Sequence, residues 1–360
     1  MRNTKFSESV TETRKQNHAK TKRDSKAAFQ LMGSDTPSPE QQYHIITELR
    51  TVADEFAKKV PVPETHQSKQ EVAGGPKNLK IGTTVFRPVG TKNEVLPVIL
   101  YLYVHFALLV KHKLNLEFTL ISHGGGWVLG SATTHTKIAT DLCIKAHAAV
   151  MLVEYSLSPE VQFPIANEQS FAALCWLRKH GKSINVNPNK IAVAGDSAGG
   201  NMAAVISMMA KDRGMEGVIK AQVLMYPAVG ADMSLYESYK TYGGGECYLS
   251  VKEAEMCGAA YLPKPASELN DRYATPILAT EDNLKGLPPA LVLTCECDIL
   301  RDEGEAYVSK LLRAGVYTVG VRVLGTIHAF MTTPLPDTPQ YLTSIKMVCD
   351  FINEQVYSSK

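Results

Sequence analysis

The sequence predicts an α/β protein with a mostly parallel sheet flanked by helices. The first observation is that short apolar runs alternate along the chain with longer amphipathic stretches. Such alternation of strands and helices is typical of a doubly wound parallel sheet with right-handed crossovers. The second observation is a buried strand, a tight glycine turn and a helix in direct succession over 191–210. The 360 residues suffice for one large α/β domain or two smaller ones.

The individual elements follow from the periodicity of the apolar residues. Strands are predicted at 79–87 (an edge strand), 98–102, 149–154, 191–194, 221–225, 290–295 and 319–324. Helices are predicted at 38–60, 133–146, 166–180, 201–210, 302–314 and 340–355. Ser38 is placed to cap the first helix, with Pro39 in its first turn.

Two regions break this rhythm. Residues 1–27 are polar, and 1–26 hold eight Lys or Arg against three Asp or Glu, so we expect a disordered tail. A mitochondrial transit peptide is the alternative, but the three acidic residues count against it. Residues 227–274 are long and mixed, which indicates an inserted lid segment. We therefore divide the chain into the tail and one domain over 28–360.

Charge and composition exclude several classes of protein. The net charge of +2 gives no electrostatic case for nucleic acid as a partner. The longest apolar stretch, 95–110, is broken by Pro97 and His105, so no transmembrane segment is expected. No apolar core of a secretory signal begins the chain. The odd number of seven cysteines, without framework spacing, predicts reduced thiols and a cytoplasmic location. Cys295 and Cys297 lack further ligands nearby, so no metal site is predicted.

The turn over 195–199 has the sequence Gly-Asp-Ser-Ala-Gly, which fits the G-x-S-x-G pattern of a nucleophile elbow. In such an elbow the serine backbone is strained, and side chains in place of the glycines would collide with the neighbouring strand and helix. A chance Gly-Ser-Gly turn is the alternative, but the flanking strand and helix favour the elbow. Ser197 is therefore the candidate nucleophile.

A serine hydroxyl needs a base, and the base needs an acid that orients it. His328 follows the last predicted strand through a short loop, where a base would reach the carboxyl edge of the sheet. Asp298 follows the preceding strand and is the favoured acid. Asp302 is the rival, but we expect it to cap the helix that begins there. The order Ser197, Asp298, His328 is the chain order expected for such a triad.

A tetrahedral intermediate also needs N–H donors for its developing oxyanion. The glycine run over 124–126 follows His123 and lets the backbone approach a substrate closely. We expect the donors to be the amides of Gly125, Gly126 and Ala198. A glycine run alone would equally fit a flexible loop, and His-Gly-Gly-Gly upstream of an elbow is the stronger signal.

Together these motifs resemble the hormone-sensitive-lipase-like branch of the α/β-hydrolases, the esterases with H-G-G-G and G-D-S-A-G-G motifs (α/β-hydrolase fold-3). The resemblance implies an α/β-hydrolase fold and an esterase acting on short to medium acyl or aryl esters through an acyl-enzyme, without a cofactor. It also implies a helical cap built from about 34–60 and 227–274. The matching stretches are 123–127, 155–160, 163–164, 195–201, 298–304, 314–316 and 328–330.

The chain departs from the family pattern at three places. Ser156 stands where the family has an arginine, which predicts weaker local ion pairing. Ala329 stands where the family has glycine, and its methyl group is expected to shift the loop beside the base. Residues 103–122 intervene between the strand at 98–102 and the glycine loop. Two explanations stay open: an extruded extra element, or a stretch foreign to the fold, such as a translated intron. We favour the second, because joining Leu102 to His123 restores the family pattern.

Two other functions compete with the esterase. One is a small-molecule receptor on the same scaffold, as in the related gibberellin receptors, which lack the catalytic histidine; His328 argues against it. The other is an inactive variant in which the insertion spoils the oxyanion loop. The sequence leaves the oligomeric state open, and a homodimer is compatible with it.

Overall fold

The structure is a computed structural model and describes residues 46–47, 50–51, 53–55, 57–74, 80–104, 125–230, 232–332 and 337–357. The predicted tail over 1–27 and the cap at Ser38 lie outside the described residues. So do residues 105–122 of the insertion, together with His123 and Gly124 of the glycine loop.

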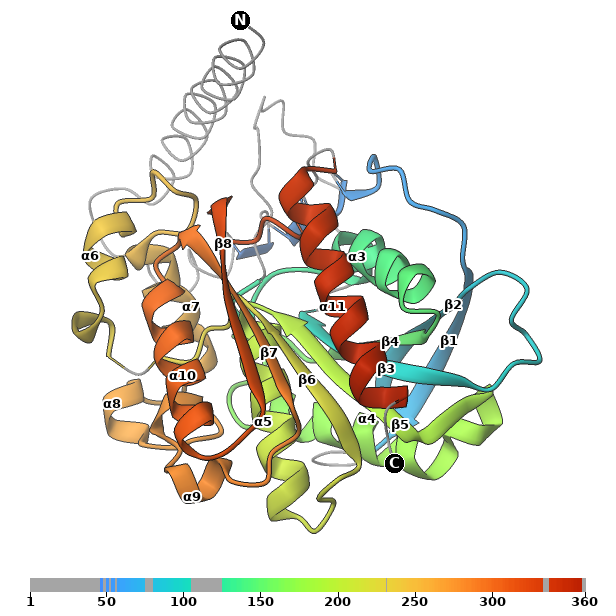
Figure 1. The fold of residues 1–360 in the computed structure, drawn as a ribbon. Coiled ribbons are helices and arrows are strands. Elements are labelled where there is room, and N and C mark those ends of the chain that lie inside the picture. The colour runs from blue at the N-terminus through green and yellow to red at the C-terminus, as the bar shows by residue number, and fades with distance from the viewer. Residues whose placement is uncertain are drawn as a thin grey trace, which may run out of the picture.

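Eight strands form one sheet in the order β1-β2-β4-β3-β5-β6-β7-β8. The six strands β4, β3, β5, β6, β7 and β8 are parallel to one another. Strand β2 pairs antiparallel with both β1 and β4. The predicted mostly parallel sheet is thus confirmed (Figure 1). The strands are β1 (His66–Ala73), β2 (Lys80–Arg87), β3 (Leu96–Val104), β4 (Ala149–Tyr155), β5 (Val186–Asp196), β6 (Ile219–Met225), β7 (Ala290–Cys297) and β8 (Thr318–Ile327).

The strand predicted at 79–87 is confirmed as β2, but its predicted position at the edge of the sheet is wrong. β2 lies between β1 and β4, and β1 is the edge of the sheet. No apolar alternation marks β1 in the sequence, because Val72 is its only buried residue and the other residues apart from Ala73 are polar. Its backbone pairing with β2, rather than an apolar face, makes this segment a strand.

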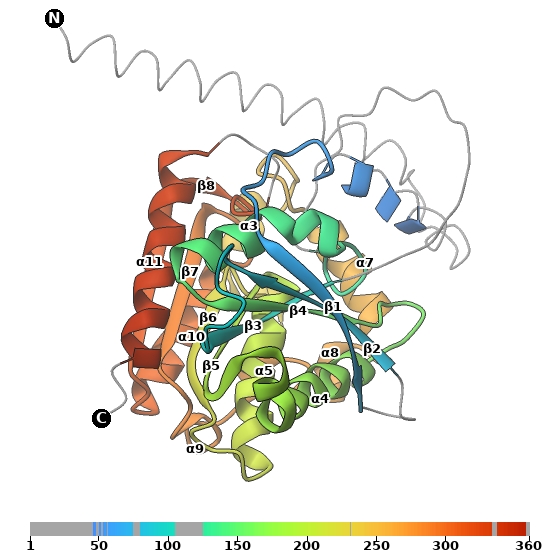
Figure 2. The same cartoon turned by 90° about the vertical axis from the view of Figure 1, so that its right-hand side faces the viewer.

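Helices cover both faces of the sheet, as Figures 1 and 2 show. One buried cluster joins the sheet to α4, α5 and α10, and a second joins the opposite face to α3 and α11. The helices are α3 (Ala132–Lys145), α4 (Ile165–His180), α5 (Ala198–Asp212), α6 (Glu237–Tyr242), α7 (Val251–Tyr261), α8 (Ala266–Leu269), α9 (Glu281–Leu284), α10 (Arg301–Arg313) and α11 (Pro339–Tyr357). None of the helices in the described part of the chain is long and apolar enough to cross a bilayer.

The two segments expected to form a cap approach the glycine loop. The described residues between 46 and 57, here called the N-terminal helical segment, are helical apart from the gaps stated above. A small buried cluster joins Ile46 of this segment to Val128 and Leu129 after the glycine loop and to Cys257 on α7. Helices α6, α7 and α8 all belong to the 227–274 connection between β6 and β7.

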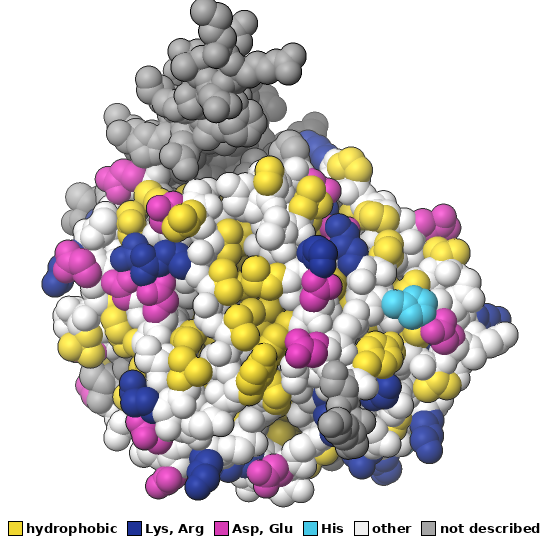
Figure 3. All heavy atoms as spheres, viewed as in Figure 1, with side chains coloured by type: hydrophobic (Ala, Val, Ile, Leu, Met, Phe, Trp, Pro, Cys, Tyr) yellow, Lys and Arg dark blue, Asp and Glu magenta, His cyan; other side chains and the backbone are white. Residues whose placement is uncertain are grey.

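The opposite edge of the sheet, β8, is open to solvent. Figure 3 shows a band of hydrophobic side chains over this strand, between α10 and α11. Leu324 on the strand is 64% exposed, and Val319, Val321 and Val323 are half-buried. An open apolar edge is a typical surface for association between chains, and the oligomeric state stays a prediction.

Candidate active site

The turn between β5 and α5 has the strained geometry of an elbow. Ser197 has φ 55° and ψ −118°, a region that non-glycine residues rarely occupy. A Cβ on Gly195 would lie 2.2 Å from the carbonyl oxygen of Gly199 and 2.9 Å from that of Leu102. A side chain at 195 is therefore excluded, and the predicted steric reason for glycine holds at this position.

The three predicted side chains form one hydrogen-bonded chain. Ser197 Oγ lies 2.9 Å from His328 Nε2, and His328 Nδ1 lies 2.7 Å from Asp298 Oδ2. All three residues are buried. They come from the ends of three different parallel strands, β5, β7 and β8, which meet at the same edge of the sheet. This is the arrangement in which a histidine can take the serine proton while a carboxylate fixes its tautomer.

Asp298 and Asp302 have different surroundings. The other oxygen of Asp298, Oδ1, accepts a 3.0 Å hydrogen bond from the amide of Leu300. The prediction that Asp302 caps α10 is wrong: Leu300 is the N-cap residue, and no side chain caps the helix. Asp302 instead lies in the first turn, where it accepts from the amide of Ser238 at 2.7 Å and pairs with Arg301. Asp302 thus joins α10 to α6 and makes no contact with His328.

The imidazole of His328 is also held by packing. The ring of Tyr226 meets it edge to face, with the ring centroids 5.2 Å apart. The next residue, Ala329, is buried and has φ 60°, a left-handed conformation in which a Cβ is unfavourable. The departure from the family glycine therefore appears as backbone strain directly after the base.

The residue before Ser197 anchors the elbow from behind. Asp196 is buried, and its Oδ1 accepts a 2.8 Å hydrogen bond from the hydroxyl of Tyr101 on β3. The same oxygen lies 3.4 Å from Nε2 of His135 on α3. The sequence motif included this aspartate but gave no partner for it, because both partners lie far away in the chain.

The described part of the glycine loop turns through three left-handed residues. Gly125, Gly126 and Trp127 have φ values of 80°, 45° and 62°. Gly125 accepts 2.6 Å hydrogen bonds at its carbonyl from the amides of Val128 and Leu129, which close the turn. Gly125 and Gly126 line the same pocket as Ser197 and His328. A Cβ on Gly126 would lie 2.4 Å from the sulfur of Cys257, so the loop packs directly under α7.

Ala198 is the first residue of α5. Amides of a helix's first turn have no partner within the helix and are available to an anion. The three amides predicted as oxyanion donors therefore stand on two sides of Ser197, in the glycine loop and at the start of α5.

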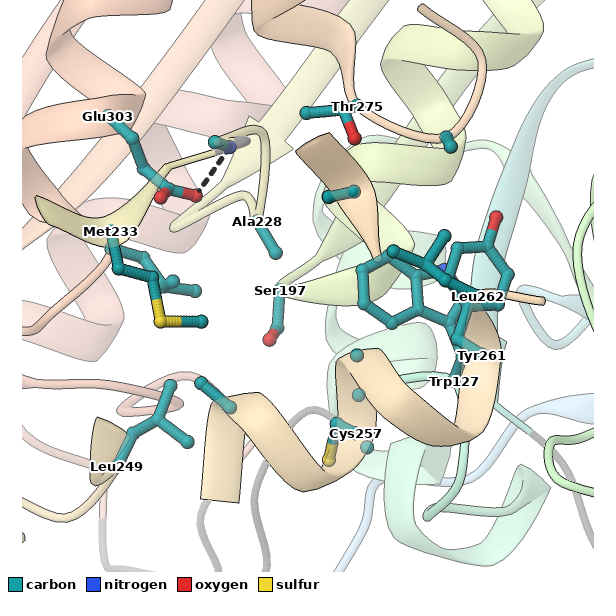
Figure 4. A pocket seen from close by; sticks show the side chains of 18 of the residues that line it. Trp127, Ser197, Ala228, Met233, Leu249, Cys257, Tyr261, Leu262, Thr275 and Glu303 are labelled. Atoms are coloured by element: carbon teal, nitrogen blue, oxygen red, sulfur yellow. Dashed lines mark hydrogen bonds between the residues drawn. The ribbon is translucent and has the colours of Figure 1, made fainter. Parts of the chain in front are cut away.

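The pocket at Ser197 has a volume of about 140 Å³ and is mostly apolar. In Figure 4 the serine stands between Met233 and Leu249 on one side and Trp127 and Tyr261 on the other. The rings of Trp127 and Tyr261 are stacked, with centroids 4.1 Å apart and planes 2° from parallel. Most of the remaining lining side chains come from the 227–274 segment, namely Ala228, Tyr239, Ala254, Cys257, Leu262, Ala266 and Ala274.

Glu303 in the pocket wall was not predicted as a site residue. It is buried on α10 and accepts 2.8 Å hydrogen bonds from the amides of Val229 and Gly230 and a 2.6 Å bond from the hydroxyl of Tyr239. Burial raises the pKa of Glu303 to about 7, although these hydrogen bonds oppose the rise. The motif over 298–304 contained this glutamate, and its burial could not be read from the sequence.

The loop that contains Ser156 has an ion pair, and the expectation of weaker ion pairing there stays a prediction. Glu160 of the same loop pairs with Arg50 of the N-terminal helical segment at 2.6 Å. Burial raises the pKa of Glu160, but the hydrogen bonds from Arg50 outweigh it and hold that pKa below its usual value. Ser156 itself donates its amide to Gln169 Oε1 at 2.7 Å. Glu160 thus ties this loop to the N-terminal helical segment.

Within the described ranges, no group of three or more His, Cys, Asp or Glu side chains could hold a metal ion. Cys295 is buried and Cys297 is half-buried, with a break in strand register between them, and both thiols are free.

Comparison with known proteins points to one family. A sequence model of the alpha/beta hydrolase fold family matches residues 119–332. A putative alpha/beta hydrolase of Acanthamoeba polyphaga mimivirus is 36% identical over 273 residues, which cover 76% of this chain and 72% of the relative. An arylesterase of Saccharolobus solfataricus is 36% identical over 212 residues, 59% of this chain and 67% of the relative.

Solved structures agree with these relatives. A structure from a study of two fungal esterases of Rhizomucor miehei superposes with a TM-score of 0.79 at 39% identity, covering 93% of this chain and 97% of its own. A thermostable esterase of Pseudomonas putida gives a TM-score of 0.75 at 32% identity, covering 86% of this chain and 90% of its own. Fold and site define a serine hydrolase of the carboxylesterase type. The chain belongs to the alpha/beta hydrolase fold family, as its resemblance to the hormone-sensitive-lipase-like branch predicts.

Proposed function

We propose that this protein hydrolyses carboxylic esters with Ser197 as nucleophile, His328 as general base and Asp298 as the acid that orients it. The observation that carries the proposal is the continuous hydrogen-bonded chain from Ser197 Oγ through His328 to Asp298, at 2.9 and 2.7 Å. Removal of any member of such a chain costs several decades in rate.

In the first half of the reaction, His328 Nε2 takes the proton of Ser197 as Oγ bonds to the ester carbonyl carbon. The carbonyl oxygen becomes an oxyanion, which accepts hydrogen bonds from the amides of Gly125, Gly126 and Ala198. The imidazolium, paired with Asp298, then gives its proton to the leaving alcohol as the C–O bond breaks. An acyl-enzyme remains on Ser197.

In the second half, water replaces the alcohol. His328 takes a proton from the water as its oxygen attacks the acyl carbon, and the same amides hold the second oxyanion. The proton then returns to Ser197 Oγ as the acid leaves. Each histidine protonation is reversed within its half-reaction, so the enzyme ends as it began.

For substrates we propose short to medium acyl esters, including aryl esters. Two features of the pocket support this class. Its volume of about 140 Å³ is small, and its walls are mostly apolar. The stacked rings of Trp127 and Tyr261 offer an aromatic surface next to Ser197. Two of the similar proteins named above are an arylesterase and a fungal esterase, which supports ester hydrolysis with aryl esters among the substrates.

The test is hydrolysis of p-nitrophenyl acetate and butyrate by the full chain and by Ser197→Ala. We expect the variant to stay folded and to lose about four to six decades in rate. A fluorophosphonate probe should label the wild type only. Near-normal hydrolysis by the folded variant would exclude Ser197 as nucleophile. A wild type that neither hydrolyses esters nor takes the probe would favour the receptor or the inactive variant.

A further inference from the structure

Arg50 is a buried arginine that no part of the proposed chemistry uses. It lies on the N-terminal helical segment and is 4% exposed. Its guanidinium forms hydrogen bonds in three directions. Nε donates to the carbonyl of Val128 at 2.6 Å, one terminal nitrogen donates to the carbonyl of Ser158 at 2.9 Å, and both terminal nitrogens reach Glu160 at 2.6 and 3.1 Å.

The Val128 carbonyl belongs to the turn that carries two proposed oxyanion donors. The amide of Val128 donates to the carbonyl of Gly125 at 2.6 Å, so the Arg50 contact lies one turn from Gly125. The amide of Ser158 donates to the carbonyl of Trp127 at 3.0 Å. Arg50 and this backbone bond together join the turn over 125–129 to the loop over 155–160.

The N-terminal helical segment makes a second polar contact with the same part of the chain. Asp54, four residues after Arg50, accepts a hydrogen bond from the hydroxyl of Ser131, the N-cap residue of α3. Ile46 of the same segment shares a small buried apolar cluster with Val128 and Leu129. The segment is therefore fixed to residues 128–131, rather than only lying over them.

The turn needs such external support because of its backbone. Gly125 and Gly126 adopt positive φ without steric cost, but the left-handed backbone of Trp127 is unfavourable for a residue with a Cβ and persists only where the surroundings hold it. A guanidinium can meet two carbonyls and a carboxylate at once because its donors have a fixed planar geometry. A lysine ammonium at the same place could keep the charge but could not hold all three partners.

We propose that Arg50 is a positioning residue for the oxyanion hole. It holds the turn over 125–129 against the loop over 155–160, so that the amides of Gly125 and Gly126 face the oxyanion that forms at Ser197. The inference rests on the proposed function, because an oxyanion hole matters only if Ser197 attacks a carbonyl carbon. Its effect should fall on the transition state, since the amides meet a full negative charge only there.

The experiment compares the full chain with Arg50→Lys and Arg50→Gln. Both variants should lose about tenfold in kcat with KM within about twofold, a smaller loss than the 10²–10³ of deleting a donor outright, because the amides are displaced rather than removed. The inhibition constant of a trifluoromethyl ketone, which forms a tetrahedral adduct, should rise by about the same factor. Melting temperatures show which variants are folded at the assay temperature. If Arg50→Lys does not fold, Arg50→Gln is used for the comparison.

Arg213→Lys is the matched control. Arg213 also pairs with a carboxylate through two nitrogens, at 2.6 and 2.8 Å from Glu168, but lies at the far end of α5 from Ser197. Its kcat should match the wild type. Glu160→Gln tests the ion pair alone: it leaves the bond from Arg50 to Val128, and kcat should change by less than about threefold.

The outcomes separate the two proposals. A folded Arg50 variant with wild-type kcat and ketone affinity would overturn the positioning role and leave the esterase intact. A wild type without esterase activity would overturn the proposed function itself, whatever the Arg50 variants do.

Discussion

The two halves of the site are supported in different ways. Ser197 and Asp298 follow β5 and β7, whose side chains are mostly buried in the core. His328 follows the edge strand β8, but its own side chain is buried and packs against Tyr226. The glycine loop has no such strand beneath its described residues. It is held instead by Arg50 and by α7, whose Cys257 packs on Gly126.

The kind of support determines which substitutions should affect each half of the site. A side chain that is itself buried keeps its place when a distant surface residue changes, because the residues around it are closely packed. A strained loop held by a few contacts moves when one of them is lost. We therefore expect the proton-transfer half to respond only to changes at its own atoms, and the oxyanion half to respond to residues of the cap segments.

The largest effect should separate the two candidate acids. Asp298→Asn keeps the shape of the side chain but favours the wrong tautomer of His328, so kcat/KM should fall by about 10³–10⁴. Asp302→Asn should cost less than about tenfold, because Asp302 binds Ser238 and Arg301 instead. Steady-state kinetics with p-nitrophenyl butyrate, beside melting temperatures, measure both. A larger catalytic loss in a stable Asp302→Asn would reverse the assignment.

The next effect tests the oxyanion half alone. Gly126→Ala places a methyl group 2.4 Å from the sulfur of Cys257 at φ 45°, so the turn must shift and kcat should fall by about 100-fold. Adding Cys257→Gly removes the collision but not the backbone strain, and should restore part of the rate. Gly90→Ala is the control, since Gly90 also has positive φ but has open space around it. Equal losses in Gly126→Ala with and without Cys257→Gly would mean that the packing against α7 is unimportant.

The insertion gives a third test. β3 pairs with β4 through Val104, two residues into the 103–122 stretch, and the rest of that stretch lies outside the described residues. If the stretch is foreign to the fold, its deletion joins Leu102 to His123 and restores the family pattern. The shortened chain should then give several-fold more soluble protein, because an exposed apolar run favours aggregation, and should be at least as active. Loss of folding or of esterase activity on deletion would show that the segment belongs to the enzyme.

A smaller effect is expected on the pH dependence of the unfolding free energy, which the carboxyl group of Glu303 should influence. Its pKa is raised from the ordinary 4.5 to about 7 in the folded protein, so the folded state binds the proton more tightly. The stability that this proton contributes is present below pH 4.5 and is lost as the pH rises to about 7. Relative to Glu303→Gln, the unfolding free energy should therefore fall by on the order of 3 kcal/mol between pH 4.5 and 7.5. Urea titrations at several pH values measure it, and a constant difference would contradict the shift.

The smallest effect is expected next to the base. Ala329→Gly removes an unfavourable left-handed alanine, which costs about 1–2 kcal/mol, but adds about 0.5–1 kcal/mol of unfolded-state entropy. A net gain of about 0.5–1 kcal/mol in stability should follow. Ala173→Gly in the buried face of α4 should have the opposite sign. Thermal unfolding compares the two, and a destabilised Ala329→Gly would show that the methyl group packs favourably.

The sequence named the side chains of the proposed proton-transfer half, but it did not name the residues that support the glycine loop. Motif and chain order named Ser197, Asp298 and His328, because short strands and turns are local features. Arg50 and its contacts with Val128 and Glu160 were not predicted, since they join residues 78 and 110 positions apart. β1 was missed for a related reason: its strand character comes from pairing with β2 and not from its own side chains. Asp302 was wrongly predicted as a helix cap because aspartate is also common within the first turn of a helix, where it does not cap the helix.

The stack of Trp127 on Tyr261 also gives the protein a built-in optical signal. The chain holds two tryptophans, and the other, Trp176, lies on α4 and lines no part of the Ser197 pocket. In a Trp176→Phe variant, all indole emission would come from the glycine loop. A ligand that enters beside Ser197, or a motion that separates α7 from the loop, would change the environment of that one ring. Stopped-flow fluorescence could then time the arrival of an ester and the release of its acid without a chromogenic substrate.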